Sequence, residues 1–224
     1  MKNLGIVLLL LGAYPMPALA VPVNVGTTIR LTDSYGDTGG GEFNADIGAN
    51  GSVDFITFCV EKTEFINLPG NYIVTGISTT TVATSHTLTA EAAYLFALFT
   101  HNALPYYEYD NDPTGSRRRS ANALQNAIWS LTGWTTSGDL GPPTGTSANQ
   151  YLYYRDLAIN ASSTAKSNAL SSVRILNLNY KNANGTAGGR AQDQLYYVPD
   201  GGTTAGLLSV TVTALCVLRR RFRQ

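Results

Sequence analysis

Alternating hydrophobic and polar residues predict strands near both ends of the central part of the chain. From Val23 to Thr32, apolar side chains alternate with polar ones, which is the pattern of a half-buried strand. A glycine-rich stretch from Gly36 to Gly41 is expected to end this strand. The same alternation predicts further strands over residues 53–60, 72–82, 173–180 and 194–198.

Between these strands the hydrophobic period changes to that of a helix. One helix is predicted from the cap Thr89 to Asn102, and a second over 117–131, with Ser116 as cap and Gly133 as stop. A third helical region is expected over 148–170. Strands followed by helices and then by strands favour an α+β fold, an antiparallel β-sheet or barrel with two or three inserted helices.

Residues 1–20 have the three parts of a secretory signal peptide. Lys2 is followed by an apolar run from Leu4 to Ala13 and by Ala18-Leu19-Ala20. This order predicts cleavage after Ala20, so that the mature protein begins near Val21 outside the cytoplasm. An uncleaved N-terminal anchor is the alternative interpretation.

The C-terminal 27 residues, 198–224, have the features of a second targeting signal. The mostly apolar stretch of fourteen residues, 205–218, would span about 21 Å as a helix, short of the ~30 Å hydrocarbon core, which makes a marginal membrane segment. The arginines behind it would stay on the cytoplasmic side. A buried C-terminal helix is the alternative. The segment is flanked by a short proline motif (Val198, Pro199, Asp200, Gly201, Gly202) and an arginine cluster (Arg219, Arg220, Arg221, Arg223).

These three parts, in this order, resemble the PEP-CTERM sorting tail, in its variant with Val-Pro-Asp. In that family the tail is removed near the motif by exosortase, a membrane-embedded cysteine transpeptidase. The resemblance therefore implies a protein that is anchored in the membrane and then released or transferred to the cell surface or matrix. Asp200 stands where the commonest form has Glu, and Cys216 would be discarded with the tail.

Composition narrows the class of the remaining domain, 21–197. Its length suits one globular domain. The chain has 15 basic and 15 acidic residues, but five of the basic ones lie at the two extreme ends, which leaves the middle with a net charge of about −5. Since phosphate binding needs clustered Lys and Arg, nucleic acid is excluded as a partner.

The domain retains one cysteine, Cys59, which is unusual for an exported protein. It lies in Phe58-Cys59-Val60-Glu61, at the end of a predicted strand, and a second motif, Gln125-Asn126-Ala127-Ile128-Trp129, lies on a predicted helix. Taken alone, each residue has an ordinary explanation, because a free cysteine packs as a small hydrophobe and glutamine is a good helix former.

Together the two motifs resemble the thioester domains of bacterial surface adhesins. The resemblance implies that the Cys59 thiol is joined to the Gln125 carboxamide, and that a partner amine could then capture the acyl group. A fold that holds the two groups together supplies about 7–11 kcal/mol of effective molarity. Slow hydrolysis calls for a dry aromatic surround, for which Phe58, Trp129 and the pair Tyr106-Tyr107 are candidates.

Other chemistry has weaker support. His86 and His101 lack metal-ligand spacing, and the acidic run 108–115 lacks the distal glutamate of a Ca²⁺ loop. The arginines 117–119 are expected to make salt bridges at the surface. We predict neither metal nor cofactor, and a non-enzymatic adhesive or matrix protein. The rival class is a carbohydrate-binding or structural matrix protein that stacks sugars on tyrosines such as Tyr151, Tyr153 and Tyr154.

Overall fold

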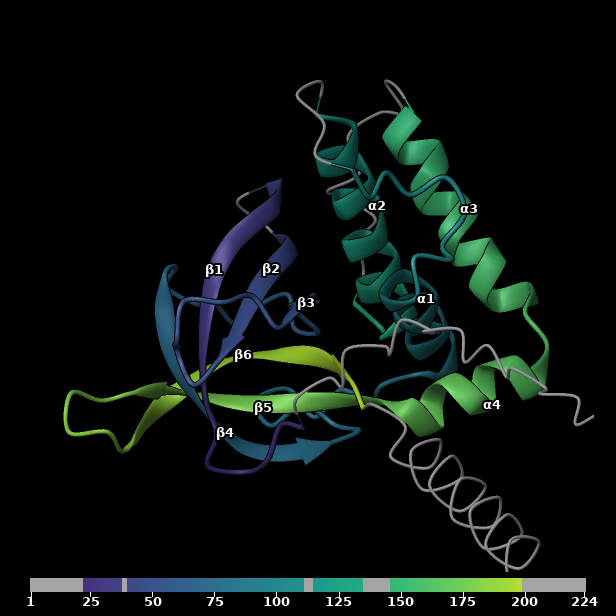
Figure 1. Ribbon diagram of the computed structural model, residues 1–224. Coiled ribbons are helices and arrows are strands. Elements are labelled where there is room, and N and C mark those ends of the chain that lie inside the picture. The colour runs from purple at the N-terminus through teal and green to yellow at the C-terminus, as the bar shows by residue number, and fades with distance from the viewer. Residues whose placement is uncertain (1–21, 38–39, 111–114, 135–145, 199–224) are drawn as a thin grey trace, which may run out of the picture.

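The computed structural model describes residues 22–37, 40–110, 115–134 and 146–198 and has an α+β fold. Six antiparallel strands form one curled sheet, a half-barrel, in the order β3-β2-β1-β4-β5-β6 (Figure 1). The strands are β1 (Thr28–Asp37), β2 (Gly40–Ile47), β3 (Phe55–Thr57), β4 (Gly70–Ser78), β5 (Val173–Lys181) and β6 (Ala187–Tyr197).

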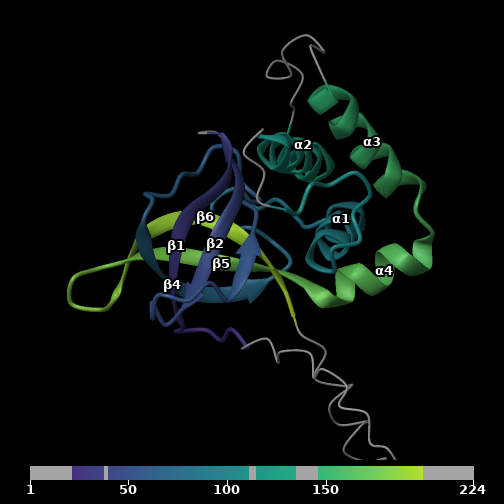
Figure 2. The same ribbon diagram turned by 45° about the horizontal axis from the view of Figure 1, so that its top comes forward.

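Four helices lie together on one side of the sheet, as both ribbon views show (Figures 1 and 2). They are α1 (Ala90–Thr100), α2 (Ser116–Leu131), α3 (Thr146–Asn160) and α4 (Ser163–Ser172). Helix α2 is the one that packs against the hairpin of β1 and β2. The sheet therefore presents its first hairpin to the helix that carries Gln125.

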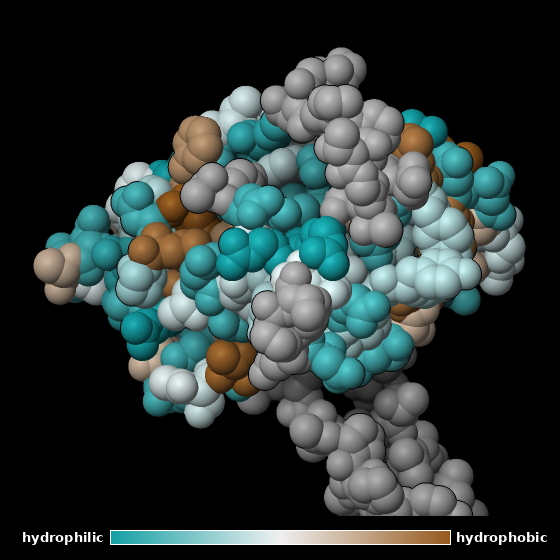
Figure 3. Space-filling view, turned by 90° about the horizontal axis from the view of Figure 1, so that it is seen from above, coloured by the Kyte–Doolittle hydropathy of each residue, from teal (hydrophilic) through white to brown (hydrophobic). Residues whose placement is uncertain are grey.

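The core has two main parts, separated by the sheet. Between the sheet and the helices lies a cluster that includes Phe58, Phe96 and Leu124. On the other face Ile29, Leu31 and Tyr72 belong to a second cluster. Seen from above, the coloured surface is mostly hydrophilic, and its largest hydrophobic group lies over the sheet (Figure 3).

The sheet differs from the sequence prediction at the glycine-rich stretch. Gly36 to Gly41 was expected to end the first strand, but β1 continues to Asp37 and β2 begins at Gly40. The first strand also starts later than Val23, because a turn closes between Asn24 and Thr27. Glycine is tolerated in this hairpin because its two strands approach closely, and strand β2 was missed because glycine weakens the strand pattern.

The helices largely confirm the prediction. Thr89 caps α1 through a hydrogen bond from the Ala92 amide, and Gly133 follows α2 with a positive φ of 93°. Ser116 does not cap α2, because Gly115 occupies that position. The third helical region is two helices instead of one, because Ser162 accepts a hydrogen bond from the Ala165 amide and starts α4.

Among the described residues, none of the helices has the length and apolar character needed to cross a membrane. The predicted signal peptide and the predicted membrane segment of the tail both lie outside the described residues.

Candidate functional site

The fold brings Cys59 and Gln125 together. Cys59 follows β3, and the chain on both sides of it is hydrogen-bonded to β6: the Leu195 amide donates to Phe58 O, and the Val60 amide donates to Asp193 O. Gln125 lies near the middle of α2, on the face turned to the sheet. Cys59 is 0% exposed and Gln125 1%. Two residues 66 positions apart thus share one buried site.

The two side chains contact each other directly. The Cys59 Sγ lies 3.2 Å from Gln125 Oε1. The Gln125 Nε2 donates to the Cys59 carbonyl oxygen at 2.8 Å, which fixes the plane of the amide against the backbone of Cys59. The sulfur thus faces the amide oxygen, which is one bond of ~1.2 Å from the carbon that it would attack.

Two backbone N–H groups converge on the same amide oxygen. Cys59 N and Gly41 N each donate to Gln125 Oε1 at 3.3 Å. Negative charge would develop on this oxygen if the sulfur added to the amide carbon. The pair of donors therefore has the arrangement of an oxyanion hole, in which one donor is commonly worth about 2.7–4 kcal/mol.

Glycine is required where the hairpin passes Gln125. A Cβ on Gly40 would lie 2.8 Å from the Trp129 ring and 2.9 Å from Gln125 Cγ, and the φ of Gly40 is +142°. A larger residue would push the hairpin away from α2 and move the Gly41 N–H from its acceptor. The glycines that interrupted the strand pattern thus allow the close approach at the site.

The surround of the pair differs from the expected aromatic set. Cys59 packs in a small cluster with Phe43 and Trp129. Phe58 points to the opposite side, into the cluster beneath the helices, where it makes edge contacts with Phe96 and Phe99. Of the tyrosine pair, Tyr107 is buried in that same cluster and Tyr106 is exposed, so Trp129 is the predicted aromatic residue that lies beside the sulfur.

Burial controls the acidity of the thiol. It raises the pKa of Cys59 far above its usual range, and the nearby charge of Glu61 raises it further. A hydrogen bond from the Cys59 backbone and the nearby Trp129 side chain lower the pKa in part. Among the described residues the Trp129 N–H has no hydrogen-bond partner. As long as its thiol is free, Cys59 is therefore expected to keep its proton at neutral pH.

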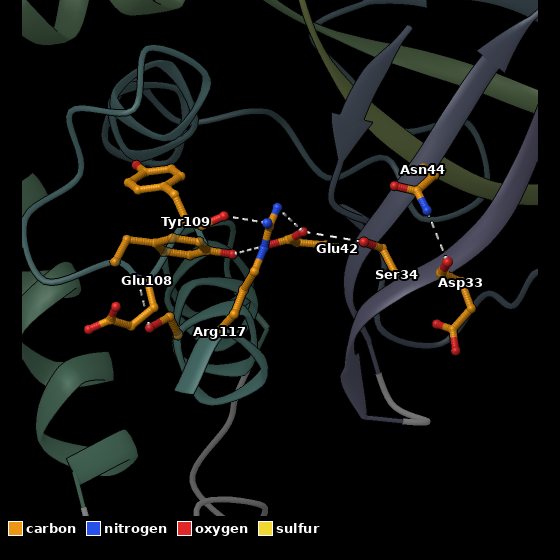
Figure 4. A network of polar contacts seen from close by, with 9 residues as sticks. Asp33, Ser34, Glu42, Asn44, Glu108, Tyr109 and Arg117 are labelled. Atoms are coloured by element: carbon orange, nitrogen blue, oxygen red, sulfur yellow. Dashed lines mark hydrogen bonds and ion pairs between the residues drawn. The ribbon is translucent and has the colours of Figure 1, made fainter. Parts of the chain in front are cut away.

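A buried ion pair fixes the hairpin to α2. The Arg117 guanidinium donates to both oxygens of Glu42, at 3.0 and 2.9 Å (Figure 4). The Tyr107 hydroxyl also donates to Glu42 Oε1. The Ser34 hydroxyl donates to Glu42 Oε2 at 3.4 Å. Glu42 directly follows Gly41, and Arg117 is on the helix that carries Gln125. This pair therefore sets the position of the Gly41 N–H relative to the Gln125 amide.

This ion pair corrects one prediction. The arginines 117–119 were expected to form surface salt bridges, but the Arg117 side chain is only 11% exposed and its partner Glu42 is fully buried. Arg118 fits the expectation, with an exposed contact of 3.9 Å to Asp37. The sequence pattern could not show this, because the partner carboxylate lies 75 residues away on β2.

Two buried carboxylates lie beside Cys59 where its segment meets β6. Glu61 accepts hydrogen bonds from Thr84 and from the Asp193 amide. Asp193 accepts from Val82, Leu178 and Asn177. Burial, aided by the Glu61 charge and opposed by these hydrogen bonds, raises the pKa of Asp193 to about 6. The contact between the Cys59 segment and β6 is therefore sensitive to pH.

Stability is expected to fall as the pH rises from about 4 to about 6, because folded Asp193 holds its proton longer than the unfolded chain does. Asp193→Asn removes this contribution. The unfolding free energy of the variant, relative to the parent, should rise by up to about 3 kcal/mol between pH 4 and pH 7 in urea titrations. The exposed Asp156→Asn is the control, and an equal change in both variants would contradict the assignment.

The two histidines, for which the sequence analysis expected no metal site, make ordinary contacts. His86 stacks on Trp134, and His101 caps the end of α1 through Ala97 O. Among the residues that the structure describes, no group of three His, Cys, Asp or Glu could hold a metal ion. The acidic run 108–115 lies partly outside the described residues.

Comparison with known proteins identifies a known motif in one part of the chain. Residues 197–222 match the VPDSG-CTERM motif. In this chain Gly201 stands where that motif has Ser. Neither a curated protein nor a solved structure matches the chain. The tail indicates an exported, surface-associated protein and implies processing by exosortase.

Proposed function

We propose that the exported domain is an adhesive surface protein, in which an internal thioester between Cys59 and Gln125 lets it bind covalently to an amine on a partner. One observation carries this proposal: the thiol, the amide and two oxyanion donors meet in a site that is closed to water. A purely structural cysteine needs a cavity of the right size, but it does not need two N–H groups aimed at the carbonyl oxygen beside it.

The proposed formation step balances as an acyl transfer. The sulfur of Cys59 bonds to the amide carbon of Gln125, the C–N bond breaks, and the thiol proton leaves with the amide nitrogen as ammonia. Charge on the former Oε1 is stabilised by the Gly41 and Cys59 amides during the step. Because burial raises the pKa of the thiol, we expect formation to be slow and to be completed once per molecule.

In the capture step, the Gln125 carbonyl is transferred from the Cys59 sulfur to an amine of the partner. A primary amine attacks the thioester carbonyl, forms an amide with the Gln125 side chain and releases the Cys59 thiol with a proton. Each molecule reacts once and is not regenerated, so we propose a non-enzymatic adhesive role. Access for the amine requires movement near Trp129, over whose ring Lys62 Nζ lies at 5.8 Å.

Intact mass distinguishes the thioester from an unreacted contact. We expect the purified protein to be lighter by one ammonia than its sequence mass, and Cys59 to resist alkylation by iodoacetamide even in denaturant. If the thiol only donates a hydrogen bond to Gln125, the mass is full and Cys59 alkylates on unfolding. That result would remove the covalent function and leave a structural matrix protein.

Processing at both ends is a separate prediction. The product isolated from its native host should begin near Val21 and lack the arginines 219–223, because the signal peptide and the sorting tail are removed. Mass spectrometry of the terminal peptides measures both. A variant with alanine at Val198, Pro199 and Asp200 should keep its tail. A mature native protein that retains the arginines would contradict removal of the tail but not export.

A further inference from the structure

A second candidate site lies at the other end of α2, away from Cys59. A hollow of about 520 Å³ opens between the segment around Tyr106, the first turns of α2 and the start of α3. Its volume is in the usual range for a small-ligand site. It is lined by tyrosine rings and by polar and charged side chains, so it suits a ligand that has both apolar faces and hydroxyl groups.

Two tyrosines form an exposed aromatic corner in this hollow. Tyr106 is 76% exposed and Tyr153 38%, and their ring centroids are 5.3 Å apart with the planes at 74°. An exposed aromatic face is a stacking surface for the C–H face of a pyranose ring, because it is apolar and electron-rich. Tyr151 and Tyr154, which the sequence also suggested for this role, are buried and unavailable.

The corner is held in place before any ligand binds. Tyr106 has a φ of +60°, a conformation that costs a bulky residue free energy and persists only where the surroundings impose it. The Gln150 amide nitrogen contacts Tyr106 O at 2.7 Å, Ser120 Oγ at 3.0 Å and the hydroxyl of buried Tyr154 at 2.7 Å. The ring platform is thus fixed to both α2 and α3, which lowers the entropic cost of binding.

The polar lining of the hollow includes hydrogen-bond acceptors and donors. Glu108 is exposed, and its backbone amide is bound by Ser120 Oγ at 3.3 Å. Arg119 contacts Ser116 Oγ at 3.2 Å on the next part of the wall. A sugar hydroxyl both donates and accepts, so neighbouring hydroxyls can pair with a carboxylate and a guanidinium together. One acidic and one basic side chain line the hollow, and this balance favours a neutral ligand.

From this arrangement we infer that the hollow binds a neutral saccharide chain, with one pyranose ring stacked on the Tyr106–Tyr153 corner and its hydroxyls at Glu108 and Arg119. An acidic chain is disfavoured, because the domain outside the two terminal basic segments has a net charge of about −5. This site is independent of the Cys59–Gln125 pair, since the two share no residue.

The test uses NMR titration of the full-length protein with cellohexaose and mannohexaose, and with a galacturonate hexamer as the charged comparison. We expect a neutral hexamer to shift the ring signals of Tyr106 and Tyr153 and to bind more tightly than the galacturonate. Tyr106→Ala and Tyr153→Ala should each weaken binding by about threefold to tenfold. Tyr106→Gly, which relieves the strained φ, keeps the fold and should also lose affinity.

Two control variants make the outcome specific. Phe65→Ala removes another exposed aromatic ring, 72% exposed, on a distant loop and should leave affinity unchanged. Cys59→Ala should also bind normally, which separates this site from the thioester. Tighter binding of the galacturonate, no shift with either neutral hexamer, or equal binding by Tyr106→Ala and the parent would overturn the inference.

Discussion

Replacing Gln125 with alanine is expected to convert Cys59 from a residue that thiol reagents do not label into one that they label fully. The variant lacks the acyl carbon, so its mass should equal its sequence mass, whereas the parent is lighter by one ammonia. In denaturant, iodoacetamide should label Cys59 in the variant and not in the parent. The reason is that Cys59 Sγ and Gln125 Oε1 lie 3.2 Å apart under two converging N–H donors.

Methylamine tests whether the thioester reacts with an amine. Prolonged incubation of the parent should attach methylamine at Gln125 and expose one thiol, and Gln125→Ala should do neither. Asn126→Ala is the matched control, because Asn126 is the next residue on α2 and its side chain donates a hydrogen bond to Asn122 O of its own helix. A parent of full mass, or methylamine incorporation that persists in Gln125→Ala, would contradict the thioester.

Arg117→Met is expected to lower the free energy of unfolding by about 3–5 kcal/mol. The methionine fills similar space but leaves the fully buried Glu42 carboxylate without its cation. It also removes the hydrogen bond to Tyr109 O and the contact over the Tyr35 ring. Urea unfolding measures the change in unfolding free energy, provided that the m value of the variant equals that of the parent.

Two comparisons isolate the buried charge. Arg118→Met changes the neighbouring arginine, which is 59% exposed and pairs with Asp37 at 3.9 Å, and should cost less than about 1 kcal/mol. The double variant Glu42→Met, Arg117→Met should recover much of the loss, because no uncompensated charge remains. Equal costs for Arg117→Met and Arg118→Met would show that the ion pair does not hold the hairpin to α2.

Local patterns in the sequence determined most of the elements. Period-two alternation located β4 and β5 to within a few residues, and Thr89 and Gly133 marked one end each of α1 and α2. The order of elements was sufficient for the α+β class. These signals are local, since capping and alternation depend on residues at most a few positions apart. The sorting tail was also identified from sequence alone, because its three parts are contiguous.

The sequence also singled out Cys59 and Gln125, since one is the lone retained cysteine and each lies in a short motif. Their contact was not determined by those motifs. It depends on the chain after β3 bonding to β6 and on the close approach of the β1–β2 hairpin to α2.

Only the tertiary structure decided the chemistry around the pair. It assigned the second N–H donor to Gly41, a residue that the strand pattern treated as a break, and it paired Glu42 with Arg117 across 75 residues. It also placed Trp129, and not Phe58, beside Cys59. Such contacts join distant segments through backbone direction and burial, which residue types and spacing along one chain do not encode.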